Sequence, residues 1–234
     1  MESVFSYNSK FIQMLMKLAD MIIMNLLFIL LCIPIVTIGA AQSALFAGIR
    51  QMMNQEDDSS CIKAFFKAFV SGFGKITIVH TVFLIIMVLF TFLLYACMVY
   101  QGGAITLPVI MCIIVLAICI LFHSMLAPFH ACFDCTAWQL ARNMYFVVMA
   151  FFLRSLAVAV LVWLPVGVAL LDLYTFMRGL PIWTLLYYSL AYLFAFSLMK
   201  KPFADLKKEF LDKQKEASAS EAAEAIEEEI EETV

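Results

Sequence analysis

The middle of the chain holds cysteine and histidine side chains, the residue types that metal and redox sites use. Cys132 and Cys135 stand in C-x-x-C spacing, and His123 and His130 come shortly before them. Two thiolates at this spacing can hold a metal ion or cycle between dithiol and disulfide. A structural zinc site needs four ligands, however, and the sequence has no second ligand pair at a convincing spacing. We therefore favour a structural interpretation, in which these residues line a cytoplasmic turn.

No other pattern in the sequence predicts catalysis. His80, His123 and His130 do not form an H-E-x-x-H motif, and neither a glycine-rich phosphate loop nor a Ser-His-Asp pattern can be read. We predict that the protein is not an enzyme and needs no metal or other cofactor.

Polar residues around an interrupted helix form a second candidate site. Pro34 lacks a backbone donor and Gly39 allows unusual backbone angles, so the segment between them predicts a turn or a broken helix. The nearby polar side chains can line a solute pathway inside the bilayer. They can equally form hydrogen bonds between helices, which is their commoner use in membranes. The candidate positions are Asn25, Pro34, Thr37, Gly39, Gln42 and Ser43.

These residues sit in a chain whose composition is that of a membrane protein. Between Lys75 and Asp134 lie 58 consecutive residues without a charged side chain. One bilayer crossing takes about 20 apolar residues, so this run predicts two crossings, joined near Gln101-Gly102-Gly103. The whole chain of 234 residues is 65 % hydrophobic and 14 % charged, against about 25 % charged in soluble domains. We predict an all-α, polytopic transmembrane bundle of five to six membrane segments with interfacial amphipathic helices.

The hydropathy pattern places these segments along the chain. A first segment is interrupted at Pro34–Gly39, and the apolar stretch after it, rich in small residues, has 14 positions that reach only about 21 Å. That stretch is a short crossing or a re-entrant arm, and we favour a hairpin with the first segment. An amphipathic interfacial helix is expected at 61–70 and a polar-aromatic connection at 128–143. The expected membrane segments are 11–33, 40–53, 76–99, 104–126, 144–171 and 180–199.

Charged residues near the segment ends predict orientation. Four lysines at 200, 201, 207 and 208 place the C-terminus in the cytoplasm under the positive-inside rule. Lys17 and Asp20 are three positions apart and can pair on one helical face. Arg154 either reaches the surface or pairs inside the bundle. The candidate interfacial or pairing charges are Lys17, Asp20, Asp134, Arg142 and Arg154.

Composition divides the chain into a membrane domain, 1–209, and an acidic tail, 210–234. Residues 217–234 hold seven glutamates and no base, which predicts a disordered or helical cytoplasmic segment. Residues 122–129 and 196–203 share Phe, Met, Pro and Phe at equal offsets. This similarity is either a parallel repeat of two-span units or chance resemblance between apolar helices.

The residues from Asn25 to Phe46 resemble the signature of the YesL-like family of bacterial integral membrane proteins, a domain of unknown function. The segments 64–69 and 128–143 resemble the parts that follow it, and the likeness covers about residues 10–203. Ala40 stands where relatives often have proline. Because relatives are often encoded beside carbohydrate-uptake transporters, the resemblance implies a bacterial inner-membrane protein that assists carbohydrate uptake.

The expected partners are therefore the lipid bilayer and a carbohydrate ABC transporter, and no nucleic acid; whether the chain forms an oligomer stays open. The alternative function is a permease-like subunit or small transporter that conducts solute itself along the Pro34–Gly39 break.

Overall fold

The computed structural model describes residues 10–54, 60–100, 105–133 and 135–209. Every regular element in these ranges is a helix. The described residues fall into two compact units that divide after Ser197. In chain order the elements are α1 (Lys10–Leu31), the 3-10 turn η1 (Ile35–Thr37), α2 (Ile38–Asn54), α3 (Cys61–Tyr100), α4 (Leu107–Cys132), α5 (Ala137–Ala150), α6 (Phe152–Leu171), α7 (Leu173–Arg178), α8 (Leu180–Ile182) and the π-helical segment η2 (Trp183–Tyr187), after which a further helix runs to Glu209.

Five of these helices are long and apolar enough to cross a bilayer, which confirms the predicted all-α, polytopic fold. Each is uncharged enough, over a window of 18 residues, to lie in the hydrocarbon layer. They are Phe11–Leu31, Cys61–Tyr100, Leu107–Cys132, Phe152–Leu171 and Leu180–Glu209.

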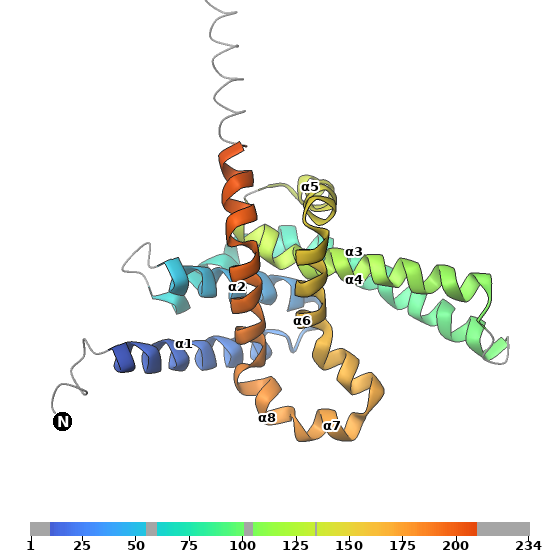
Figure 1. Cartoon of the computed structure of the whole chain (residues 1–234), viewed down its shortest axis with the longest axis horizontal. Helices are drawn as coiled ribbons and strands as arrows, with labels where there is room; N and C mark the ends of the chain where they lie inside the picture. The colour runs from blue at the N-terminus through green and yellow to red at the C-terminus, as the bar shows by residue number, and fades with distance from the viewer. Residues whose placement is uncertain (1–9, 55–59, 101–104, 134, 210–234) are drawn as a thin grey trace, which may run out of the picture. The chain divides into compact units, whose positions relative to one another are not determined.

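The predicted break between α1 and α2 is present. Pro34 has an extended backbone (φ −76°, ψ 118°), and η1 follows it directly. The Thr37 hydroxyl donates to the carbonyls of Leu31 and Pro34, which satisfies backbone groups that the interrupted helix leaves open. α1 and α2 then run in opposite directions (Figure 1), as a hairpin requires.

α2 is the most enclosed helix of the fold. It contacts α1, α3 and α4, and its residues from Gly39 to Ile49 are all buried. Its small side chains, such as Ala40, Ala44 and Ala47, let neighbouring backbones approach closely, which is how helices associate in lipid.

α3 differs from the sequence prediction of an interfacial helix followed by a separate span. It is one continuous helix of 40 residues, about 60 Å long, twice the thickness of the hydrocarbon core. No proline interrupts it, and its first half has a partner because Cys61, Phe65 and Ile76 are buried on a face that packs against α2. Figure 1 shows its second half lying beside α4.

α4 also continues further than predicted. We expected the span to end at Leu126 and a connection to begin at Pro128, but the helix includes Pro128 and ends at Cys132. Residues Leu126 to Phe129 are buried where α4 packs on α2 and α3. This packing outweighs the backbone hydrogen bond that Pro128 removes, a tolerance typical of membrane helices.

The predicted single helix over 144–171 is wrong. The structure has two helices, α5 and α6, separated at Phe151 (φ −123°, ψ 41°). α5 begins with a capping box, in which the Thr136 hydroxyl accepts from the Gln139 N–H and the Gln139 side chain accepts from the Thr136 N–H. Leu140, Met144 and Val147 are buried on one face of α5, so the segment that we interpreted as a connection is a packed amphipathic helix.

Three sequence predictions concern residues outside the described ranges. They are the turn at Gln101-Gly102-Gly103, the pairing of Asp134 and the acidic tail 210–234. The parallel repeat also stays a prediction.

Candidate functional site

Asn25 of α1 ties this helix to the π-helical segment η2. Its amide nitrogen donates to the carbonyls of Trp183 (3.3 Å) and Thr184 (2.6 Å), and its oxygen accepts from the Ser189 N–H (3.0 Å). The Asn25 side chain is fully buried. A π-helix shifts backbone hydrogen bonds by one residue and leaves carbonyls misaligned, so Asn25 supplies the donors that η2 lacks.

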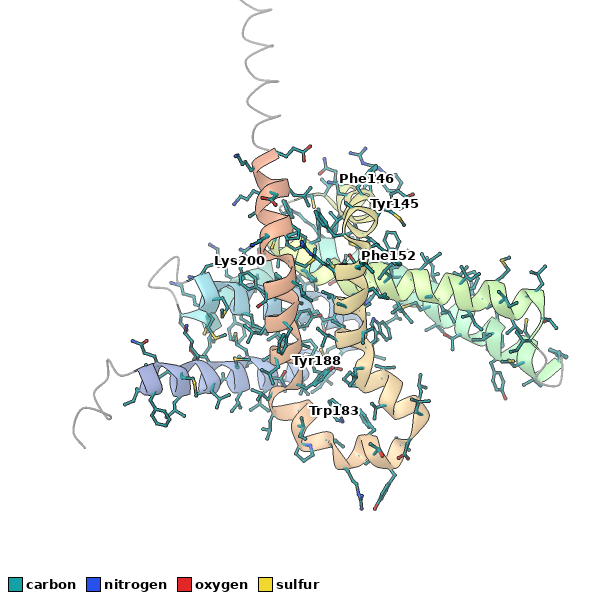
Figure 2. The ribbon with its side chains drawn as sticks, viewed as in Figure 1. Tyr145, Phe146, Phe152, Trp183, Tyr188 and Lys200 are labelled. Atoms are coloured by element: carbon teal, nitrogen blue, oxygen red, sulfur yellow. The ribbon has the colours of Figure 1, made fainter. Side chains whose placement is uncertain are left out.

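Two further contacts support the same junction. The Ser189 hydroxyl donates to the Met21 carbonyl at 2.8 Å, and the rings of Phe28 and Tyr188 pack with centroids 5.0 Å apart. Figure 2 shows Trp183 and Tyr188 on successive turns of the chain that follows α8. Asn25 thus forms hydrogen bonds between helices, which is one of the two roles that the sequence left open for it.

A pair of buried histidines lies where α3 and α4 meet. His80 Nδ1 and His123 Nε2 are 2.9 Å apart, within hydrogen-bonding distance, and the two side chains are 2 % and 5 % exposed. A neutral imidazole has one N–H donor and one acceptor nitrogen. One ring therefore donates to the other across the helix interface.

The histidine pair connects to two other elements. Gly39, at the start of α2, packs so closely on His80 that a Cβ at this position would lie 2.6 Å from His80 Cβ. On the other side, the His123 ring meets the Trp163 ring of α6 edge to face, with centroids 5.4 Å apart. Gly39 is thus a site of close approach to the histidine pair.

Several buried polar atoms of α3, α4 and α6 have no hydrogen-bond partner. His80 Nε2, His123 Nδ1 and Trp163 Nε1 are all buried without a hydrogen bond in the described structure, as are the hydroxyl oxygens of Thr77 and Ser155. A buried polar group without a partner costs about 1–3 kcal/mol.

A second histidine contact joins α2 to the end of α4. Ser43 Oγ and His130 Nδ1 are 2.8 Å apart, and the Arg50 guanidinium donates to the Ala131 carbonyl. A cation at this place also interacts favourably with the last carbonyls of α4. Gly72 of α3 lies against the same ring, because a Cβ there would be 2.3 Å from His130 Cε1.

The remaining candidates of the helix break are separate from the histidine pair. Gln42 is buried in α2, and Thr37 bonds within the break. Pro34 is exposed. In the structure Gly39 therefore contacts His80 and Ser43 contacts His130. Asn25 lies apart from them, at the contact between α1 and η2.

Of the predicted charged residues that the structure describes, Lys17 and Asp20 are half-buried within α1, and Arg142 and Arg154 are exposed. Asp20 of α1 hydrogen-bonds to the Cys61 thiol at the start of α3, and Lys17 lies one turn before it. Arg142 is exposed on α5. Arg154 is exposed at the start of α6, with its guanidinium 5.9 Å from the centre of the Phe151 ring, and its position relative to the bilayer stays a prediction.

The C-x-x-C spacing does not assemble a metal site in the described part of the chain. Cys132 is the last residue of α4, and Cys135 follows beyond it. No group of three or more His, Cys, Asp or Glu residues there is arranged to hold a metal ion.

A groove of about 680 Å³ lies between α4 and α6. Its walls are apolar and include Ile118 and Leu121 of α4 and Ala159, Trp163 and Gly167 of α6. Such a surface accommodates hydrocarbon and offers nothing to a sugar hydroxyl.

Sequence reasoning missed the histidine pair, although a signal was present. His80 lies 22 positions before Gly102, and His123 lies 21 positions after it. Two antiparallel helices joined near Gly102 bring such equidistant positions face to face. Gly72 lies 30 positions before Gly102 and His130 lies 28 positions after it, so these two residues meet across the helices in the same way.

Comparison with known proteins adds one similarity. A search of curated proteins and a search of solved structures each give no match. Residues 21–94 match the model of a family described as a protein of unknown function, DUF624. This range contains the helix break, α2, Asn25 and His80, so over these residues the chain is similar to that uncharacterised family.

Proposed function

We propose that this chain is a multi-pass protein of the bacterial inner membrane that assists carbohydrate uptake by contacting a transporter. The carbohydrate context comes from the resemblance to the YesL-like family. The cytoplasmic position of the C-terminus comes from the lysines that follow the last apolar segment.

One observation favours a role in assisting a transporter over conduction of solute by this chain. Polar side chains near the break form hydrogen bonds between helices. Asn25 makes three hydrogen bonds to η2 and the helix after it, and Ser43 faces His130. Side chains that bond between helices are not free to replace the hydration shell of a solute. The groove between α4 and α6 is apolar as well.

The exposed apolar side chains in the second half of α3 support contact with another membrane protein. Val82, Ile85, Leu89 and Phe92 are each more than half exposed, and the most apolar window of α3 has no buried residue. Large apolar surfaces of this kind face lipid or a partner helix.

Paired transport measurements test the proposal. In cells, removing the gene should lower the uptake of a labelled sugar, and restoring it should return uptake to the starting rate. In liposomes, the purified full-length chain should leave sugar flux at the rate of empty liposomes. Flux above that rate, abolished by Asn25→Ala and retained by the exposed-site control Ser197→Ala, would instead establish the permease-like alternative. Unchanged uptake in cells together with silent liposomes would reject both.

A further inference from the structure

We infer that Trp163, His123 and His80 form a one-way hydrogen-bond relay that connects α6 through α4 and α3 to the helix break. The proposal starts from three ring nitrogens that lack hydrogen-bond partners, Trp163 Nε1, His123 Nδ1 and His80 Nε2. They belong to three rings in sequence, since Trp163 contacts His123 and His123 bonds to His80.

The donors and acceptors available on the three rings fix the direction in which the hydrogen bonds run. An indole nitrogen can only donate, so a hydrogen bond from Trp163 to His123 needs an acceptor nitrogen on His123. The nitrogen of His123 that remains for this bond is Nδ1, because Nε2 is taken by His80. A neutral His123 with a bare Nδ1 carries its proton on Nε2 and donates it to His80 Nδ1. His80 then carries its own proton on Nε2.

The break supplies the last acceptor. The backbone of Ile35 is close enough to the His80 ring to interact with it, although no group meets hydrogen-bond geometry at Nε2. The Ile35 carbonyl accepts from the Ile38 N–H and keeps a second lone pair. The relay therefore requires the Trp163 and His80 rings to rotate until their two hydrogen bonds form.

The reverse direction fails at both ends. If His80 donated to His123, then His123 Nδ1 would carry a proton and two donors would face each other at Trp163. His80 Nε2 would carry a lone pair and face a carbonyl. Two mismatched contacts in a medium without water would each cost about 1–3 kcal/mol, whereas the forward direction sets a donor opposite an acceptor at each contact once the outer rings rotate.

The surroundings keep the relay neutral. Between Ser60 and Leu171 the sequence holds one acidic residue, Asp134, so the helices around the pair provide no buried counter-ion. The titratable or charged groups nearest along these helices are Lys75 of α3, Cys119 of α4 and Arg154 of α6, none of which is negative at neutral pH. Asp172, which follows α6, is negative but exposed. A neutral relay links α6 to the break through hydrogen bonds that all run in one direction. Its loss removes the hydrogen bond that holds the break to His80 of α3.

Nitrogen NMR of the full-length protein in lipid nanodiscs, with histidine rings labelled, tests the assignment. We expect bare Nδ1 and protonated Nε2 in both buried rings, and His130→Gln identifies the third ring by removing its signals. Trp163→Phe should shift the Nδ1 signal of His123, while the control Trp138→Phe, at an exposed site on α5, should leave it unchanged. A proton on His123 Nδ1 would overturn the proposal.

Hydrogen exchange at the break gives an independent readout. Trp163→Phe should speed amide exchange over residues 35–39 about threefold, from the average strength of side-chain hydrogen bonds between membrane helices. His80→Gln should do the same, and the double variant should add little, because both changes interrupt one row. Additive effects, or exchange equal to that of Trp138→Phe, would contradict the relay even where the NMR assignment held.

Discussion

Replacing Asn25 by leucine should loosen the junction between α1 and the last membrane helix. The substitution keeps similar volume and removes three hydrogen bonds, to the Trp183 and Thr184 carbonyls and from the Ser189 N–H. At about 0.6 kcal/mol for each hydrogen bond between membrane helices, the loss is about 2 kcal/mol. The backbone groups left behind are shielded from water, and their unmet hydrogen bonds raise the estimate to about 4 kcal/mol.

Reversible unfolding of the full-length protein in mixed micelles measures this loss. A loss of about 2 to 4 kcal/mol raises the unfolding equilibrium constant roughly 30-fold to 1,000-fold, and amide exchange should rise locally over residues 184–189. Two serines of the same helix give a matched pair. Ser189→Ala removes one interhelical bond and should cost about 0.6 kcal/mol, whereas Ser197→Ala removes an exposed bond to Leu193 within the helix and should cost close to nothing.

The assignment of Asn25 to stability would be refuted by one result in particular. If Asn25→Leu unfolded at the same denaturant concentration as the unmodified chain, with unchanged exchange over residues 184–189, the three hydrogen bonds would carry no free energy. Asn25 would then again be a candidate for solute contact.

Three further perturbations follow from local geometry. Gly72→Ala should destabilise the protein and separate His130 from Ser43, because the new Cβ meets the His130 ring. Gly74→Ala has open space and should stabilise α3 by up to about 1 kcal/mol; equal unfolding midpoints for the two variants would contradict the packing. The hydroxyl of Thr175 and the Tyr174 N–H, which bond to Asp172, lower the pKa of this carboxyl below its usual 3.8. Its cap on α7 is therefore complete above that value and is lost as pH falls through the lower pKa. Exchange at Tyr174 should accelerate only in that acid range, and Asp172→Asn should remove the pH dependence. Fusion of a fluorescent protein after residue 209 should give fluorescence and fusion of alkaline phosphatase there no activity; the opposite pattern would invert the predicted topology.

The break at Pro34–Gly39 and the apolar spans were readable from the sequence because their signals are local. Proline removes a donor wherever it stands, and a run of about 20 apolar residues has no other stable surroundings than lipid. Helix ends were less readable where packing decided them. Pro128 lies inside α4 because α2 and α3 cover it, and α5 ends at Ala150 with no proline or glycine to mark the place.

The sequence by itself determined that this chain is an all-helical membrane protein, because the solvation of uncharged side chains depends on composition and spacing alone. Only the tertiary structure decided which polar residues meet. Asn25 lies 158 positions from Trp183, and His80 lies 43 from His123. Partners so far apart are chosen by the way helices pack, since a buried donor takes whichever acceptor the neighbouring helix brings within reach.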